Sequence, residues 1–349
     1  MPPSFVHRRR FAAATVLSAA TLAAPRLLAR SARMERESVS IAVGGRSLLC
    51  YLPLTVADQL GFFREEGLDV AIQDFAGGAL ALQAVQDGRA DLCSGAYEHT
   101  LRQQMRGREY RAVVLQGRAP QLALGLSVRA MRGFRGLPDM AGRIIGVSAV
   151  GSSTQAMASL LLDRAGVDLS CVQFVGVGSD VGALDALRSG QIQALCHADP
   201  IMTVLEQKNH IRLVSEIRSL SAAQEVFGGE MPAACLYAPQ AFLHRRPAVA
   251  QALANGIVHA LKWLQTAGPA DLVKVVPEAY LLGDRRLYLA AFNRVRETFS
   301  TNGLMPAQGP ANAQRAMARV DTLLRGRQAD LSRTFTNQWA NKAQQKFDV

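Results

Sequence analysis

The feature that most constrains the fold is a regular alternation between short apolar runs and amphipathic segments that stop at glycine. The run VSIAVG (39–44) has the alternation of a strand, and the next segment carries apolar residues at helical spacing as far as Phe63 and stops at Gly67. GGALALQAVQDG (77–88) predicts another helix and ADLCSG (90–95) another strand. Alternation of this kind is typical of mainly parallel sheets covered by helices, so we expect an α/β fold.

A second series of the same kind follows the glycine-interrupted segment RGFRGLPDMAG (132–142). The first series ends with a helix at about 97–106 and strands near 111–116 and 122–128. The second series predicts, in order, strand 143–147, helix 152–166, strand 171–177, helix 180–190, strand 192–196, helix 200–207 and strand 211–215. From Cys235 onward the pattern changes to amphipathic helices at 247–265, 284–300 and 311–326.

The first 34 residues have the order of a signal peptide. Three arginines at 8–10 precede an apolar stretch from Phe11 to about Ala24, which Pro25 interrupts, and small residues suited to cleavage follow. The apolar stretch is shorter than the roughly 20 residues that span a bilayer. We therefore expect 1–34 to be an export signal and the protein to be periplasmic. The arginine run fits either the twin-arginine route or the general secretory route.

The net charge gives little support to nucleic-acid binding. The chain carries a formal +11, but six arginines precede its first acid, Glu35, so the mature protein is only about +5. The densest interior basic cluster is Arg129, Arg132 and Arg135, without interleaved aromatic residues. We interpret this cluster as a solvated loop and expect no nucleic-acid partner.

Five cysteines, an odd number, leave at least one thiol unpaired, and no CxxC pair or zinc-ligand spacing occurs. We expect buried cysteines that act as small apolar side chains. No metal and no cofactor are expected.

In parallel α/β sheets, ligands bind in the loops at the carboxyl ends of strands. The loops of this kind include GGRSLLCYLPL (44–54), DFAGGAL (74–80), CSGAYEHT (93–100), VSAVGSSTQ (147–155) and LCHADP (195–200). Glycines and hydroxyls at helix starts offer free N–H groups to an acceptor on a ligand. Taken singly, each loop is explained by a turn or a plain N-cap. A ligand site is favoured because all of these loops lie at strand ends.

Catalytic motifs are weak in this chain. His99, His197 and Asp199 could form an acid/base set, and Cys196 stands beside His197. Adjacent strand residues point to opposite faces, which separates Cys196 from His197, and no GxSxG or HExxH occurs. We expect no catalytic residues; His197 is either a polar cleft residue or a structural histidine.

The run YLPLTVADQLGFFREEGLDVAIQDFAGGALALQAVQDGRADLCSGAYEH (51–99) resembles the NitT/TauT group of ABC-transporter substrate-binding proteins, also called SsuA/THI5-like or NMT1-like. The shared pattern is A..LGFF.EEGLDV, then a glycine pair and AL..G.AD. The likeness extends over about residues 39–240.

The resemblance implies a type II periplasmic-binding-protein fold, in which two α/β lobes are joined by two crossovers and followed by a helical C-terminal tail. The first lobe would hold residues 38–130 and 238–349, and the second 131–237. It implies a periplasmic protein, expected to be a monomer, that captures a small polar organic molecule or oxyanion and delivers it to an ABC permease and ATPase. A pyrimidine-precursor enzyme on this fold, or a ligand-sensing subunit, is the alternative.

The loops matched to the family give the candidate ligand-binding residues, which are Leu49, Tyr51, Gly77, Gly78, Ser94, Tyr97, Glu98, His99, Ser152, Ser153, Thr154, His197 and Asp199. The resemblance implies a small oxyanion, an alkyl sulfonate or a pyrimidine precursor of thiamine. A site for a bare anion should lack unpaired carboxylates, so Glu98 and Asp199 either point elsewhere or meet a ligand that presents donors. The second case favours a nitrogen heterocycle or amine stacked on Tyr51 or Tyr97.

Overall fold

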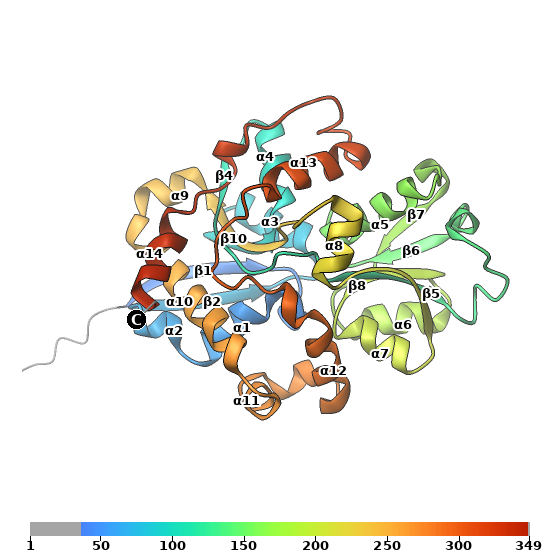
Figure 1. The fold of residues 1–349 in the computed structure, drawn as a ribbon, viewed down its shortest axis with the longest axis horizontal. Helices are drawn as coiled ribbons and strands as arrows, with labels where there is room; N and C mark the ends of the chain where they lie inside the picture. Colours follow the sequence, from blue (N-terminus) through green and yellow to red (C-terminus); the bar gives the residue numbers. More distant parts are fainter. Residues whose placement is uncertain (1–35, 348–349) are drawn as a thin grey trace, which may run out of the picture. The chain divides into compact units, whose positions relative to one another are not determined.

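The computed structural model describes residues 36–347, so the expected signal peptide, 1–34, lies outside the described residues. Two five-stranded mixed sheets organise this part of the chain (Figure 1). The first sheet has the order β2 (Leu68–Asp74), β1 (Glu37–Val43), β3 (Leu92–Ala96), β10 (Ala234–Pro239), β4 (Tyr110–Leu115). The second has the order β7 (Gln173–Gly176), β6 (Ile144–Val147), β8 (Ala194–Ala198), β5 (Leu122–Ser127), β9 (Ile211–Ile217). Each sheet with its helices is called a lobe below.

The two sheets share one plan. In the first sheet β1 pairs in parallel with β2 and β3, and β10 runs antiparallel between β3 and β4. In the second sheet β6 pairs in parallel with β7 and β8, and β5 runs antiparallel between β8 and β9. The antiparallel strand of each sheet is thus the one that the chain enters after leaving the other sheet.

This exchange of strands corrects the expected lobe boundaries. The first lobe is expected to extend to residue 130, but β5 already pairs with β8 in the second sheet. The first crossover therefore lies between β4 and β5, and the second ends where β10 begins at Ala234. The glycine-rich segment 132–142 suggested a boundary by its composition, but it only connects β5 to β6 within the second lobe.

Helices cover both faces of each sheet. The first lobe contains α1 (Leu52–Gln59), α2 (Phe62–Glu65), α3 (Gly78–Gln86) and α4 (Glu98–Met105). The second contains α5 (Ser153–Arg164), α6 (Val181–Ser189), α7 (Ile201–Gln207) and α8 (Leu220–Phe227), with α5 on one face of its sheet and α6 and α7 on the other (Figure 1). The alternation read from the sequence is confirmed, whereas α8 was not predicted.

The expected C-terminal helical tail is confirmed. It consists of α9 (Gln240–Arg245), α10 (Pro247–Thr266), α11 (Pro269–Val275), α12 (Arg285–Val295), α13 (Gly309–Val320) and α14 (Gln338–Phe347). The longest of these, α10, packs on α1, α2 and α14, and Gly256 permits the approach because a Cβ there would lie 2.5 Å from the Phe63 ring. In contrast, α12 packs on α7 and α13 on α5, so the tail contacts the second lobe as well. Within residues 36–347, no helix combines the length and apolar character needed to cross a membrane.

Candidate functional site

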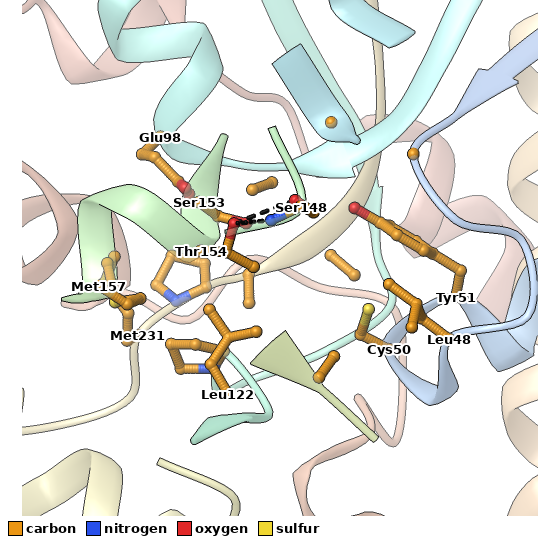
Figure 2. Close-up of a pocket in the computed structure, with 18 residues that line it drawn as sticks. Leu48, Cys50, Tyr51, Glu98, Leu122, Ser148, Ser153, Thr154, Met157 and Met231 are labelled. Atoms are coloured by element: carbon orange, nitrogen blue, oxygen red, sulfur yellow. Dashed lines mark hydrogen bonds between the residues drawn. The ribbon is translucent and has the colours of Figure 1, made fainter. Parts of the chain in front are cut away.

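A pocket lies where the strand ends of the two sheets meet, and it is called the interlobe pocket here (Figure 2). In this closed form its cavity volume is about 30 Å³, far below the roughly 300–1,000 Å³ usual for small-molecule sites, so the lobes must move apart to admit an organic ligand. Both lobes and both crossovers supply its lining, which comprises Gly44, Leu48, Cys50, Tyr51, Gly78, Ala96, Glu98, Pro120, Leu122, Ser148, Ser153, Thr154, Met157, Ala198, Met231, Pro232, Ala233 and Ala234.

Three helix starts contribute to the lining. Gly78, Glu98 and Ser153 are the first residues of α3, α4 and α5, respectively. The N–H groups of a helix's first turn have no partner within the helix, and the dipole places positive partial charge there. The positively polarised ends of helices from both lobes therefore line the pocket.

The predicted glycine pair allows one of these helix starts to come close to the first sheet. A Cβ on Gly44, directly after β1, would lie 2.2 Å from the backbone nitrogen of Gly78. Such a contact is far shorter than van der Waals distance, so only glycine fits at residue 44 without moving α3. Gly78 lines the pocket, whereas Gly77 faces Ala149 of the second lobe.

Glu98 is the acidic residue in the lining. Its side chain is buried, and its Oε1 atom has no hydrogen-bond partner within the part of the chain that the structure describes. Burial raises the pKa of this carboxyl to about 7. No lysine, arginine or histidine belongs to the pocket lining. Glu98 therefore presents a hydrogen-bond acceptor that lacks a donor to any ligand that enters the pocket.

The rest of the lining is mostly apolar, with hydroxyls on the second-lobe side. The Thr154 hydroxyl accepts a hydrogen bond from the Ser148 N–H at 3.0 Å and lies 3.0 Å from the Ser148 hydroxyl (Figure 2). On the first-lobe side Tyr51 presents its ring, and burial raises the pKa of its phenol well above the usual value. Burial also raises the pKa of the Cys50 thiol to about 12, which keeps it protonated.

Hydrogen bonds between the lobes close the sides of the pocket. The Ala79 N–H donates to the Ser152 hydroxyl at 2.9 Å, and the Leu49 N–H donates to the Asp199 carbonyl at 2.9 Å. The Arg102 guanidinium donates to the Gly151 carbonyl at 2.7 Å. Each bond joins an element of the first lobe to the second, so the structure represents a closed form.

Five of the thirteen predicted residues line the pocket, and these are Tyr51, Gly78, Glu98, Ser153 and Thr154. Leu49, Gly77 and Ser152 contact the other lobe beside it, as described above. The remaining five do not line the pocket, and these are Ser94, Tyr97, His99, His197 and Asp199.

Asp199 does not offer its carboxylate to a ligand. Its Oδ2 lies 3.2 Å from Nη1 of the buried Arg218, and its Oδ1 accepts the Thr203 N–H at 2.8 Å. Tyr97 is likewise directed away from the pocket, because its hydroxyl lies 2.6 Å from the Thr334 hydroxyl of the tail. Of the two tyrosines predicted to stack on a ligand, Tyr51 lines the pocket and Tyr97 does not.

The two predicted histidines are buried behind the pocket wall. His99 Nδ1 lies 3.0 Å from the Tyr237 hydroxyl, and burial lowers the pKa of His99 to about 3. His197 Nε2 lies 3.0 Å from the Gly178 carbonyl, and burial lowers its pKa as well. Of the two interpretations of His197, the structure fits the structural histidine. Ser94 accepts a hydrogen bond from the Gln116 side chain at 2.9 Å.

Thirteen lining residues were not predicted, and six of them lie in the crossovers or at the strand starts that follow them; these are Pro120, Leu122 and 231–234. Pro120 ends the loop LQGRAP (115–120), which follows a predicted strand, whereas the other five lie in no such loop. Their apolar character gave no signal of a site. Their position along the chain did indicate a site, because a segment that passes between two lobes must run beside the space between them.

Comparisons with known proteins agree with the fold described above. Residues 50–267 match the family model NMT1/THI5 like. A protein of Bordetella bronchiseptica RB50 is similar over 90% of this chain and 99% of its own, with 47% sequence identity and a TM-score of 0.87. No curated protein matches the sequence.

Two more distant structures share the fold. The alkanesulfonate-binding protein SsuA from Xanthomonas axonopodis pv. citri, bound to MOPS, is 18% identical, with a TM-score of 0.67 over 87% of this chain and 99% of its own. The periplasmic nitrate-binding protein NrtA from Synechocystis PCC 6803 is 11% identical, with a TM-score of 0.66 over 90% of both chains. The expected type II periplasmic-binding-protein fold is thereby confirmed. With its two strand-exchanged lobes and its match over 218 residues, the chain belongs to the NMT1/THI5-like family.

Proposed function

We propose that this chain is a periplasmic solute-binding protein, exported by its N-terminal signal peptide, that captures a small organic molecule and delivers it to an ABC importer. The observation that carries the proposal is the interlobe pocket, whose lining comes from both sheets and both crossovers. A ligand held there contacts both lobes at once. SsuA and NrtA, which share the fold, are named as binding proteins for alkanesulfonates and nitrate.

Delivery requires that the ligand change the shape of the protein. A ligand that bridges two lobes favours the closed form by the difference between its affinities for the closed and open forms. The two crossovers supply the connection about which the lobes would separate. The closed form would then dock on a permease, with the protein acting as a monomer.

Binding without turnover agrees with the chemistry of the lining. Cys50 is the thiol in the pocket, and a pKa of about 12 leaves it almost entirely protonated and a poor nucleophile. His99 and His197 are not part of the lining, so neither stands beside Glu98 in the pocket as a second acid or base. These features support a binding protein over the alternative of a pyrimidine-precursor enzyme.

The test uses the mature protein and a panel of sulfonates, oxyanions, pyrimidines, amines and small amides. We expect at least one compound to raise the melting temperature and to decrease the radius of gyration in small-angle X-ray scattering. Mass spectrometry should recover that compound unchanged. Conversion of the compound would favour an enzyme, and a panel without any binder would contradict the proposal.

Transport and sensing are separated by uptake. Cells that lack this protein should lose uptake of the compound found in the panel, and the intact gene should restore it. Normal uptake in the deletion strain, with an altered transcriptional response to the compound, would support the sensing alternative.

A further inference from the structure

Resting on the proposed function, we infer that the ligand carries an amide-type group, which places an N–H donor on Glu98 and a carbonyl acceptor at the helix starts. The corollary is that the pocket rejects bare oxyanions. The inference is carried by the unpartnered Oε1 of Glu98, which is buried in the pocket wall at the start of α4. Without a donor from the ligand, this oxygen loses the hydrogen bonds it had with water.

No cation of the lining competes for Glu98 or would pair with an anionic ligand. The nearest basic residue along α4 is Arg102, one turn after Glu98. Its Nε lies 2.7 Å from Asp321 Oδ2, and its Nη1 donates to the Gly151 carbonyl. Because Arg102 is thus engaged outside the lining, an oxyanion in the pocket would face Glu98 with no opposite charge between them.

A simple organic cation would satisfy Glu98 but not the remainder of the site. The first residues of α3 and α5, Gly78 and Ser153, bring N–H groups and positive partial charge to the same space. Some of these groups are already used, because the Ala79 N–H donates to the Ser152 hydroxyl. The positive ends of both helices still favour an acceptor on the ligand, and an ammonium group has none. A primary or secondary amide has a donor nitrogen and an acceptor oxygen on the same carbon, and it is neutral.

An amide also tolerates both protonation states of Glu98. Since burial raises the pKa of Glu98 to about 7, the carboxylate and the acid are both populated near neutral pH. The carboxylate accepts an amide N–H, whereas the acid can donate to an amide carbonyl. A carboxylate or sulfonate ligand can pair only with the acid, and an ammonium ligand best with the carboxylate.

The remaining walls indicate what the amide is attached to. Leu122, Met157 and Met231 form an apolar part of the lining, and Tyr51 adds an aromatic ring. These side chains suit a compact apolar or aromatic body. The chemical class is therefore a small carboxamide or cyclic amide with an apolar framework.

The experiment compares matched isosteres on the mature protein by titration calorimetry at pH 7.5. The pairs are benzamide with benzoate, nicotinamide with nicotinate, and cyclopentanecarboxamide with cyclopentanecarboxylate, with benzenesulfonate and benzylamine as further members. We expect at least one amide to bind about tenfold or more tightly than its paired carboxylate, as expected for one hydrogen bond to a charged group. If no amide exceeds its partner, or if benzenesulfonate or benzylamine binds most tightly, the inference is wrong.

Glu98→Gln assigns the preference to this residue. The amide side chain removes the charge and adds a donor, so carboxylates should gain affinity and the amide-to-carboxylate ratio should fall by about tenfold. Glu225→Gln removes the same charge from an exposed position on α8 and should leave the ratio unchanged. A ratio that is the same in Glu98→Gln and wild type would overturn the inference.

A measurement on the wild type keeps the test independent of the variant's folding. Lowering the pH from 8 to 6 protonates Glu98, so benzoate should bind more tightly while benzamide changes little. Equal pH dependence of the two ligands would contradict a role for Glu98. A protein that binds and closes on sulfonate alone would retain the proposed function and refute only this inference, whereas binding of no compound would refute the proposed function itself.

Discussion

The hydroxyl of Ser152 accepts a hydrogen bond from the backbone N–H of Ala79 at 2.9 Å, across the boundary between the lobes. Ser152 is the residue before α5 in the second lobe, and Ala79 lies in the first turn of α3 in the first. The sequence suggests Ser152 as the N-cap of α5, but its hydroxyl accepts a hydrogen bond from α3 of the other lobe instead. This bond stabilises the closed form alone, because opening of the lobes would separate its two atoms.

Ser152→Ala should shift the balance towards the open form. Loss of one buried hydrogen bond is worth about 1 kcal/mol, so ligand affinity should fall about fivefold while the melting temperature of the unliganded protein changes little. Isothermal titration with the compound from the binding panel measures the affinity. Ser170→Ala, which removes an exposed hydroxyl from the second lobe, is the control and should bind normally. Equal affinities of the two variants would show that the Ser152 bond does not contribute to closure.

Gly77→Ala should hold the lobes apart by steric contact. A Cβ at Gly77 would lie 2.7 Å from the Ala149 Cβ and 3.0 Å from the Ala149 nitrogen in the second lobe. The backbone at Gly77 has an extended φ of 178°, which any residue adopts, so the substitution should not strain the first lobe. We expect a larger radius of gyration with ligand present and at least a tenfold loss of affinity.

The control for this change is Gly133→Ala, because a Cβ at Gly133 would meet no heavy atom within 4 Å. This variant should contract on ligand binding as the wild type does. If Gly77→Ala also contracts fully, the closed form has more freedom at this contact than the structure indicates.

The order of elements could be read from the sequence because each helix and strand carries its own periodicity. The assignment of β5 to a sheet could not, since Leu122–Ser127 is a uniformly buried strand whose partners, β8 and β9, follow it by many residues. Only its long-range pairing with β8 and β9 decides to which sheet such a strand belongs. The glycines and proline of 132–142 were a stronger local signal than the true crossover, and they misplaced the boundary.

The site was predictable where backbone geometry alone determines it. Gly78 and Ser153 are helix starts at strand ends, and both line the interlobe pocket. Asp199 and Tyr97 occupy equivalent loops, yet their side chains turn to Arg218 and Thr334. Those partners are 19 and 237 residues away in the chain, so no local pattern distinguishes the side chains that enter the pocket from those that leave it.

Asp199→Asn should destabilise the second lobe more than it weakens binding. Arg218 is 1% exposed, and it would lose the only fully buried carboxylate among its ion-pair partners, although Glu216 and Glu206 remain near it. An incompletely compensated buried charge costs about 3 kcal/mol. Urea unfolding should show this loss, whereas Asp185→Asn, which breaks the exposed pair with Arg188, should change stability by less than about 0.5 kcal/mol. Similar unfolding midpoints for both variants would contradict a structural role for the Asp199–Arg218 pair.

Glu98 should make the free energy of unfolding fall as the pH rises. Burial raises the pKa of Glu98 from 4.5 to about 7, so between these values the folded protein holds a proton that the unfolded chain has released. Integrated over this range, the effect is about 3 kcal/mol. Glu98→Gln has no such proton, and its stability relative to wild type should therefore increase steadily from pH 5 to pH 7.5.

The stability of the wild type must be compared with that of a variant, because His99 gives the free energy of unfolding the opposite dependence on pH. Burial lowers its pKa from 6.5 to about 3, so the unfolded chain binds a proton that folded His99 rejects, and stability falls as the pH drops below 6.5. Since His99 is present in both proteins, its contribution cancels in the difference between Glu98→Gln and wild type. Urea unfolding at pH 5, 6, 7 and 8 measures that difference, with Glu225→Gln as the control whose curve should run parallel to wild type. A parallel curve for Glu98→Gln would mean that a protein group or water already satisfies this carboxyl, and the unpartnered acceptor in the pocket would then be absent in solution.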